Sequence, residues 1–216
     1  MKRPLLLGHR GARDSRNVPE NTLASFELCL QYGCDGFEFD VRRSADGEAV
    51  ICHDPVIRGM EIAKTQSAAL GLPTLQQVLQ TFAAHAFLDI ELKVGGLEET
   101  TIDLLRKHPP EKGYVVSSFL PEVLIALNDL DRVIPLGLIC ERRDELDHWR
   151  ELPIAWVIPQ WEIADNLLIE QLRAAGKKVM VWTVNREDQI RRFGELGVDA
   201  VVSDEVAVAA RVLAGP

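Results

Sequence analysis

Short apolar runs alternate with amphipathic segments along the whole chain of 216 residues. Each apolar run has the length and composition of a strand, and the segments between the runs have helical periodicity. This alternation is typical of a parallel βα protein, in which each strand is followed by a helix that covers it. The predicted strands are Leu5–His9, Gly36–Arg43, Val50–His53, Ala86–Lys93, Tyr114–Phe119, Pro135–Cys140, Ala155–Gln160, Lys178–Val184 and Asp199–Ser203.

Four of the predicted helices have clear boundary signals. Gly33, Gly176 and Gly197 each stand just past a helical pattern, where glycine commonly ends a helix. Pro73 immediately precedes the remaining pattern and marks its start. The helices predicted from these signals are Glu20–Tyr32, Thr74–Ala84, Ala164–Ala175 and Glu187–Leu196.

The strand count points to a barrel. Eight βα units remain if Val50–His53 is a hairpin extension of Gly36–Arg43, turned at Asp46-Gly47. Eight is the strand number of the TIM (β/α)8 barrel, and this chain lies near the short end of its length range. An open doubly wound sheet is the alternative, but no G-x-G-x-x-G fingerprint follows the first strand. We therefore expect a single-domain α/β TIM barrel over residues 1–216, with a short insertion after the second strand.

Composition narrows the function classes. The chain is 47% hydrophobic and 26% charged, which is ordinary for a soluble globular protein. No apolar run approaches the roughly 18 residues that span a bilayer, and the first residues carry too few apolar side chains for a signal peptide. The formal charge of −9 argues against nucleic acid or an anionic membrane surface as a partner.

Cysteine usage favours a reducing compartment. The four cysteines form no CxxC pair, so we expect reduced, half-buried thiols in a cytoplasmic protein.

The oligomeric state stays open, because Phe82, Trp149 and Trp156 are compatible with either a core position or a subunit contact.

Two carboxylates stand in a strand that would otherwise be apolar. In the run GFEFDV, residues 36–41, alternation places Glu38 and Asp40 on one face and Phe37 and Phe39 on the other. The phenylalanines suit a face covered by helices. Glu38 and Asp40 are therefore expected to point into the barrel, at the end where a parallel barrel carries its active site.

The next barrel strand adds more charge to the same interior. Alternation aligns Asp89, Glu91 and Lys93 on one face. Unpaired carboxylates in a confined interior would cost several kcal/mol each, so a hard divalent cation with oxygen ligands is expected to compensate them. A buried ion-pair network with Lys93 and Arg10 is the alternative, and the deeper Asp89 is expected to be a structural partner.

Two histidines flank these carboxylates at strand ends. His9 and His53 are arranged as general acid–base catalysis would use them, one imidazole accepting a proton and the other donating one. The remaining histidines fall in helices or loops and are expected to be solvated. They are His85, His108 and His148.

The local charge balance suits a phosphodiester. Three carboxylates, one divalent ion and the side chains of Lys93 and Arg10 together leave one positive charge. A phosphodiester carries one negative charge, so the site could hold it despite the acidic chain, with the metal as Lewis acid.

Six motifs, in this order along the chain, resemble the glycerophosphodiester phosphodiesterase family. They are HRGA, PENT, E-x-D-V, HDP, E-x-K and WTVN, which begin at His9, Pro19, Glu38, His53, Glu91 and Trp182. The family is a TIM barrel that hydrolyses glycerophosphodiesters to sn-glycerol 3-phosphate and an alcohol. The resemblance therefore implies a phosphoric diester hydrolase whose partner is a small phosphodiester.

The resemblance also implies a role for each motif residue. The implied groups are a catalytic acid–base pair of His9 and His53, metal ligands Glu38, Asp40 and Glu91, substrate contacts Arg10, Lys93 and Trp182, and supporting residues Glu20 and Asn21. The cation would be Mg²⁺ or Ca²⁺, with Mn²⁺ also compatible. A barrel-core position is the alternative for Trp182.

One departure from the family leaves the substrate open. Only Val56–Leu72 separates HDP from the next helix, whereas family members usually carry a longer insertion that helps cover the site. Lysophospholipids or other diesters are alternative substrates, and the nucleophile is either water or the glycerol hydroxyl of the substrate.

Two other classes of protein remain as alternatives. A barrel isomerase or aldolase would not explain the paired histidines, and a non-catalytic binding barrel should lack a motif residue.

Overall fold

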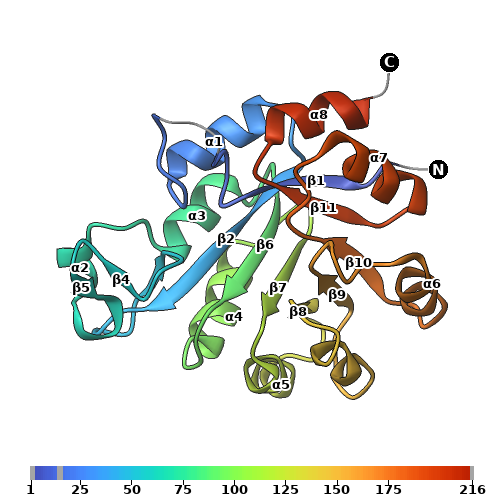
Figure 1. The fold of residues 1–216 in the computed structure, drawn as a ribbon. Coiled ribbons are helices and arrows are strands. Elements are labelled where there is room, and N and C mark those ends of the chain that lie inside the picture. The colour runs from blue at the N-terminus through green and yellow to red at the C-terminus, as the bar shows by residue number, and fades with distance from the viewer. Residues whose placement is uncertain (1–2, 14–16, 215–216) are drawn as a thin grey trace.

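Eight parallel strands close into a barrel in the computed structural model, which describes residues 3–13 and 17–214. The first strand pairs with both the second and the last, which closes the ring. Figure 1 shows these strands in the middle of the molecule with helices around them. Around the barrel they are β1 (Leu5–His9), β2 (Gly36–Arg43), β6 (Phe87–Leu92), β7 (Tyr114–Ser118), β8 (Leu136–Cys140), β9 (Trp156–Pro159), β10 (Lys178–Val181) and β11 (Ala200–Ser203). The predicted TIM barrel is confirmed.

The predicted hairpin extension is also present. Strand β3 (Ala49–Ile51) runs antiparallel to the end of β2, with Val41 opposite Ile51. Gly47 has a φ of 85°, a left-handed conformation that glycine adopts without strain, and turns the chain between the two strands. His53 lies just beyond β3 rather than inside it.

Helices cover the outside of the barrel. Helix α1 begins at Leu23 and not at the predicted Glu20, because Thr22 forms a capping box with Ser25: the Thr22 hydroxyl accepts from the Ser25 amide at 3.1 Å. Between β8 and β9 a 3₁₀ segment, η2 (Glu145–Arg150), stands in place of an α-helix. The barrel helices are α1 (Leu23–Gln31), α3 (Leu75–Phe82), α4 (Glu98–Lys107), α5 (Pro121–Leu130), α6 (Asn166–Ala174), α7 (Glu187–Leu196) and α8 (Val206–Ala214).

The two faces of β2 divide as alternation predicts. Phe37 and Phe39 point outward and pack with Phe26 of α1 and Phe82 of α3. The rings of Phe26 and Phe37 stack with their centroids 4.2 Å apart and their planes 5° from parallel. This aromatic layer fixes β2 against its helices, and the opposite face of the strand is therefore turned into the barrel.

The lower part of the barrel interior is filled by apolar side chains. Leu7, Phe87, Val115, Trp156 and Met180 belong to one buried cluster there. Trp156 is thus a core residue, as are Phe82 and Trp149, which are also buried. The polar residues nearer the carboxyl ends of the strands sit on top of this apolar layer.

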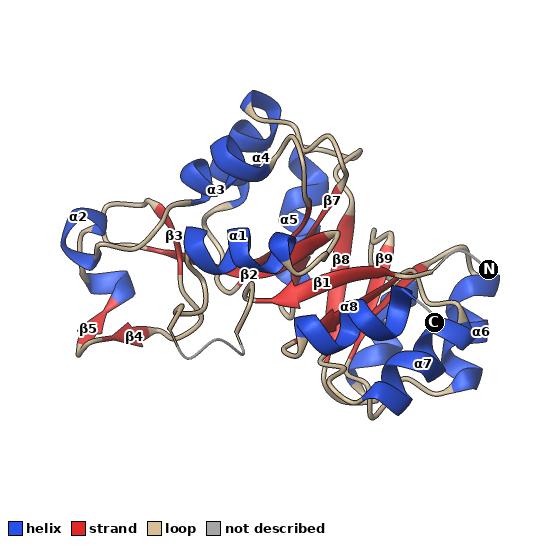
Figure 2. Cartoon of the chain, turned by 90° about the horizontal axis from the view of Figure 1, so that it is seen from above, coloured by secondary structure: helices blue, strands red, loops and turns tan. Residues whose placement is uncertain are grey.

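The insertion Val56–Leu72 forms a small unit beside β3. It contains strands β4 (Val56–Ile57) and β5 (Met60–Glu61), the 3₁₀ turn η1 (Ile62–Lys64) and the short helix α2 (Ser67–Leu70). Figure 2 shows it at the side of the molecule away from the chain termini. Asp46, in the β2–β3 turn, ties it down by accepting hydrogen bonds from the Ser67 amide at 2.9 Å and the Ser67 hydroxyl at 2.8 Å.

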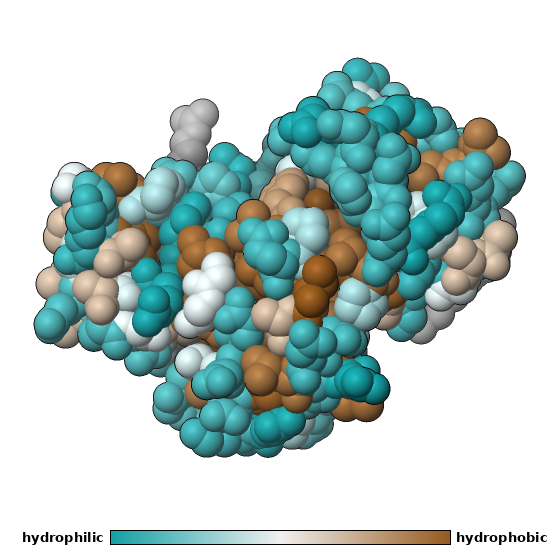
Figure 3. All heavy atoms as spheres, turned by 90° about the horizontal axis from the view of Figure 1, so that it is seen from below, coloured by the Kyte–Doolittle hydropathy of each residue, from teal (hydrophilic) through white to brown (hydrophobic). Residues whose placement is uncertain are grey.

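One face of the surface is mainly polar (Figure 3), and the thiols are more buried than predicted. The face shown in Figure 3 is covered mainly by hydrophilic side chains, with smaller hydrophobic patches between them. All four cysteines are buried, more fully than expected, and no disulfide joins them within the described residues. None of the described helices is both long enough and apolar enough to cross a bilayer.

The anchor of the insertion is expected to depend on pH. Hydrogen bonds from Ser44 and Ser67 lower the pKa of Asp46 from 3.8 to about 2. A lowered pKa means that this stabilisation is complete above the unfolded-state value and is lost as pH falls towards 2. Asp46→Asn should therefore lower the urea midpoint most at pH 5 and above, and the gap to wild type should narrow below pH 4. An unchanged gap over that range would contradict the anchor.

Candidate active site

A cavity of about 250 Å³ lies at the carboxyl ends of the barrel strands, and seven of the ten residues predicted for the site line it. Asp40, Glu20 and Asn21 are not part of its lining. One side carries ionisable groups and the other is mostly apolar. Its ionisable side is lined by His9, Arg10, Glu38, His53, Asp89, Glu91 and Lys93. A larger hollow of about 800 Å³ lies beside Tyr114, Trp156 and Lys178 and contains none of the predicted site residues.

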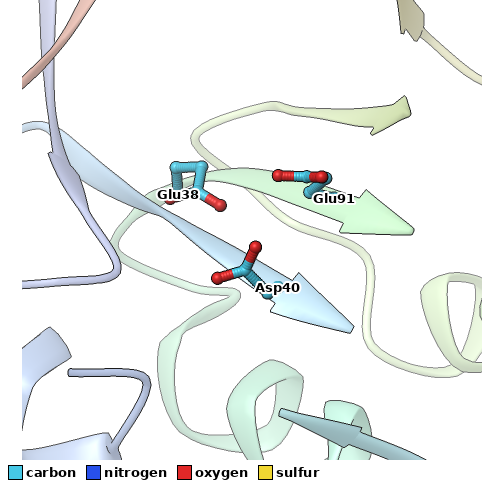
Figure 4. A group of neighbouring side chains, drawn as sticks. All are labelled: Glu38, Asp40 and Glu91. Atoms are coloured by element: carbon cyan, nitrogen blue, oxygen red, sulfur yellow. The ribbon is translucent and has the colours of Figure 1, made fainter. Parts of the chain in front are cut away.

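Three carboxylates from two neighbouring strands converge beside this cavity, and Glu38 and Glu91 line it. Glu38 and Asp40 point inward from β2, and Glu91 lies directly opposite Asp40 in the register of β6. Figure 4 shows the three side chains facing a common centre. One oxygen of each lies within 4.8 Å of the others, and all three residues are buried. Such a set of oxygens is the donor set that hard divalent cations prefer.

Gly36 allows the two strands to approach closely at the start of this register. A Cβ atom at this position would lie 1.8 Å from the backbone oxygen of Phe87. Only glycine fits there without moving the backbone. The pairing of β2 with β6, and with it the placement of the carboxylates, therefore depends on a residue two positions before Glu38.

Two cations share the cavity with the carboxylates. Lys93 Nζ lies 2.6 Å from Glu91 Oε1 and 3.4 Å from Asp40 Oδ1, and Arg10 Nε lies 3.2 Å from Asp40 Oδ2. The backbone amide of Arg10 donates to Glu38 Oε2 at 3.0 Å. The other oxygen of Glu38 is buried and has no hydrogen-bond partner in the part of the chain that the structure describes. The ion-pair network considered from the sequence thus exists, but it leaves one carboxylate oxygen unsatisfied.

The pKa values reflect this uneven pairing. Burial would raise the pKa of Asp40, but Lys93, Arg10 and a hydrogen bond from Asn21 hold it below its ordinary value. Burial and the neighbouring Asp40 raise the pKa of Glu38 well above its ordinary value, and raise that of Glu91 to about 7. Ionising Glu38 and Glu91 together therefore costs free energy that a bound cation would offset.

Asp89 lies beneath the carboxylate cluster and is held separately. It accepts a hydrogen bond from the Ser117 hydroxyl at 2.6 Å and is almost completely buried. Burial raises the pKa of Asp89 to about 7. The contact with Ser117 agrees with the structural role expected for Asp89.

His9 is oriented by a carboxylate that sequence reasoning missed. Its Nδ1 lies 2.7 Å from Asp204 Oδ1, which leaves Nε2 directed into the site, 3.9 Å from Glu38 Oε2. Asn185 holds Asp204 in turn, donating from Nδ2 to Oδ2 at 2.8 Å and accepting from the Asp204 amide at 2.9 Å. The signal for Asp204 was its position directly after β11, the same strand-end position that identified His9.

His53 is held in a similar way but is more exposed. Its Nδ1 lies 2.7 Å from Asp54 Oδ1, and its carbonyl accepts from Arg42 Nε at 2.7 Å. The side chain is 36% exposed, against 12% for His9. The two imidazoles therefore reach one cavity from different depths.

The loop after β1 brings Glu20 and Asn21 to the mouth of the site. Arg10 Nη1 lies 2.8 Å from Glu20 Oε1, and Asn21 donates to Asp40 at 2.8 Å. Arg10 and Asn21 both have a φ of 57°, which is uncommon for residues other than glycine and marks a locally strained backbone. Hydrogen bonds from the Asn21 amide and the Ser25 hydroxyl to the Arg10 carbonyl hold this conformation.

An apolar wall faces the charged side of the cavity. Trp182 and Phe119 pack edge to face with ring centroids 5.6 Å apart, and Trp182 Nε1 donates to the Ile158 carbonyl at 2.9 Å. Trp182 also packs against the buried cluster of the barrel interior, so it is both a wall of the cavity and a core contact. The residues of this wall are Phe119, Ile139, Glu141, Ile158, Trp182 and Val202. Glu141 was missed by sequence reasoning, although it directly follows β8.

The short insertion stays outside the cavity. No residue of Val56–Leu72, a segment that the structure describes in full, lines it. The mouth beside the more exposed His53 is therefore not covered by this segment.

A TIM barrel with a carboxylate cluster and two histidines at the carboxyl ends of its strands fits a metal-dependent hydrolase, and comparison with known proteins identifies the family. The model of the glycerophosphoryl diester phosphodiesterase family matches residues 9–65 and 61–208. The chain belongs to this family, and it is an enzyme of the phosphoric diester hydrolase class. Six motifs had already indicated both conclusions.

Similar proteins cover almost the whole chain. A glycerophosphodiester phosphodiesterase of Caldanaerobacter subterraneus is 28% identical and covers 93% of this chain and 94% of its own length. A solved phosphodiesterase of Oleispira antarctica, in complex with the product sn-glycerol-3-phosphate, is 28% identical with a TM-score of 0.87, over 99% of this chain and 98% of that one. A glycerophosphodiester phosphodiesterase structure from Thermotoga maritima has a TM-score of 0.85 at 21% identity, over 98% of this chain and 99% of that one.

The contact between His9 and Asp204 predicts a single tautomer. Because Asp204 can only accept when ionised, neutral His9 should carry its proton on Nδ1. Imidazole ¹⁵N NMR at pH 8 is expected to show a protonated Nδ1 for His9 in wild type and exchange between tautomers in Asp204→Ala. Asp54→Ala is the matched control, and it should change only the signals of His53. A His9 ring protonated on Nε2 in wild type would contradict the contact.

Proposed function

We propose that this enzyme hydrolyses glycerophosphodiesters to sn-glycerol 3-phosphate and an alcohol, with a divalent cation and a pair of histidines. The observation that carries the proposal is the placement of His9, His53 and the buried carboxylate cluster around one cavity. Its relative from Oleispira antarctica, similar over nearly the whole chain, was solved with sn-glycerol-3-phosphate. We expect the enzyme to act in the cytoplasm.

The residues present fit a divalent cation. Glu38, Asp40 and Glu91 each offer one oxygen, and Glu38 Oε1 is buried without a hydrogen-bond partner over residues 3–13 and 17–214. An unsatisfied carboxylate oxygen in the interior is costly, and a cation would satisfy it. Mg²⁺ and Ca²⁺ suit this donor set, and Mn²⁺ is also compatible. The cation would serve as a Lewis acid that stabilises negative charge on the phosphoryl oxygens.

Arg10 and Lys93 make the site attractive to an anion. Both are already beside the carboxylates, and both guanidinium and ammonium groups form short charge-assisted hydrogen bonds to phosphate. With one divalent cation they would outnumber the three carboxylates by one charge. The site would therefore bind a singly charged phosphodiester in spite of the overall charge of −9.

The two histidines supply the proton transfers. Each has its Nδ1 bound by a carboxylate, Asp204 for His9 and Asp54 for His53, so that Nε2 is the nitrogen left to exchange protons. One imidazole accepts the proton of the attacking hydroxyl, and the other donates a proton to the departing alkoxide. The attacking group is either water or the free hydroxyl of the glycerol moiety, which would first give a cyclic phosphate.

Trp182 gives the carbon skeleton of the substrate an apolar surface. Its ring lines the cavity opposite the charged groups and is fixed by Phe119 and the Ile158 carbonyl. A fixed wall limits the orientations of a bound diester, which favours alignment of the nucleophile and leaving group.

Removing either imidazole should slow turnover strongly. His9→Ala and His53→Ala are each expected to lower kcat for glycerophosphocholine by roughly 10²–10⁴-fold, because each deletes one proton transfer. His148→Ala, at an exposed position of η2, is the matched control and should keep wild-type activity. Circular dichroism and thermal unfolding check that the variants fold. Near-normal turnover in either site variant would overturn the assignment of that histidine.

Metal removal should abolish activity, and metal affinity should rise with pH. Carboxylates ligate only when deprotonated, and the pKa of Glu91 is raised to about 7. Cation binding should therefore weaken as pH falls below about 7 and should release protons, which calorimetry in two buffers of different ionisation enthalpy measures. Glu91→Gln is expected to weaken binding at least about tenfold, whereas Glu99→Gln on α4 serves as the control. Full activity in the presence of excess chelator would refute the metal site.

A further inference from the structure

The two walls of the active-site cavity differ in their chemistry. The wall formed by β1, β2 and β6 carries both the cations and the carboxylate cluster. The wall formed by β7 to β11 is apolar except for one ionisable residue, Glu141. Glu141 stands among apolar and aromatic side chains. It has no part in the proton transfers or in the carboxylate cluster described above.

The backbone directs Glu141 toward the cavity. In β8, Ile139 belongs to the buried cluster inside the barrel, whereas Leu138 and Cys140 belong to the core outside it. A Cβ atom added at Gly137 would meet Ile158 and Val115, so that position also faces inward. Alternation then places residue 141 on the inward side, in agreement with its position in the cavity wall.

Glu141 is also left without a side-chain partner among the described residues. The basic side chains that follow it in sequence are committed elsewhere. Arg142 pairs with Asp144 and Glu145, and Arg143 pairs with Asp165. The carboxylate is exposed at the cavity mouth, and its charge is therefore available to a ligand.

Two aromatic side chains, Phe119 and Trp182, line the same wall of the cavity as Glu141. Lys93 Nζ lies 5.5 Å from the centroid of the Phe119 ring, so the site's own cation already contacts that ring. Trp182 lines the same wall without a cation contact within the described residues. An aromatic ring together with a carboxylate is the combination that recognises substituted ammonium groups.

We propose that Glu141 and Trp182 form a subsite for a positively charged leaving alcohol, so that the enzyme prefers diesters with an ammonium or trimethylammonium head group. The inference rests on the proposed function, because it assigns the second end of the same substrate. Such a diester is zwitterionic. Its phosphate would face Arg10, Lys93 and the carboxylates that would hold a cation, and its ammonium group would face Glu141. With the cation bound, the charges of ligand and cavity would match along their length.

The test compares two diesters that differ in head-group charge. For glycerophosphocholine, Glu141→Gln should lower kcat/KM by roughly threefold to tenfold, the range expected for one partly solvated charge pair. For glycerophosphoglycerol, whose head group is uncharged, the same variant should change kcat/KM less than twofold. Raising the ionic strength should reduce the wild-type preference for the cationic head group, because salt screens exposed charges.

A matched control separates the subsite from a general charge effect. Glu162→Gln removes the same charge from an exposed position after β9 that does not line the cavity, and it should leave both substrates unaffected. Glu141→Lys should lower turnover of glycerophosphocholine further than Glu141→Gln does. An equal loss of kcat/KM for both substrates in Glu141→Gln would place Glu141 against the shared glycerol moiety and would overturn the proposal. No loss of kcat/KM for either substrate would also overturn it.

Binding distinguishes failure of the subsite from failure of the proposed function. Calorimetric titration of His53→Ala with glycerophosphocholine and with glycerophosphoglycerol measures affinity without turnover. Adding Glu141→Gln to His53→Ala should weaken the binding of glycerophosphocholine only. Wild-type protein that cleaves neither diester would refute the proposed function. Equal affinity of the single and the double variant for glycerophosphocholine would refute the subsite by itself.

Discussion

The burial of carboxylates on β2 is the constraint on which the site depends. Alternation forces Glu38 and Asp40 to the face opposite Phe37 and Phe39, and the phenylalanines are held outward by the stacked layer with Phe26 and Phe82. Turning the carboxylates out would bury them against α1 and α3 and move Phe37 and Phe39 out of that packing into the barrel. The hydrophobic effect on one face of a strand therefore keeps the charges on the other face inside the barrel.

The polar groups around the β2 carboxylates offset part of the electrostatic cost of burying them. Lys93 and Arg10 approach Asp40, Asn21 donates to it, and the pKa of Asp40 falls below its ordinary value. Among the described residues, Glu38 accepts one backbone hydrogen bond, from the Arg10 amide, and its second oxygen has no hydrogen-bond partner. Hydrogen bonds and ion pairs thus compensate one carboxylate almost fully and another only in part, which is the pattern expected where a cation completes the set.

Local sequence rules predicted the strands, their inward faces and the grouping of Glu38, Asp40 and Glu91, because each rests on a short period. Strand alternation in GFEFDV was sufficient to place Glu38 and Asp40 on one inward face. The start of α1 was missed by three residues because the capping box of Thr22 and Ser25 outweighs the apolar pattern. The 3₁₀ form of η2 likewise has no signal in hydrophobic periodicity.

Contacts between distant segments could not be predicted in the same way. Asp204 meets His9 only because β11 closes the barrel against β1, and the two residues are 195 positions apart. Glu141 reaches the cavity from a strand that contributes no motif. Closure of the barrel therefore does more than bury apolar surface. It sets an orienting carboxylate behind His9 where β11 meets β1, and an apolar wall opposite the carboxylate cluster. The arrangement of the site and the stability of the fold therefore depend on the same strand order.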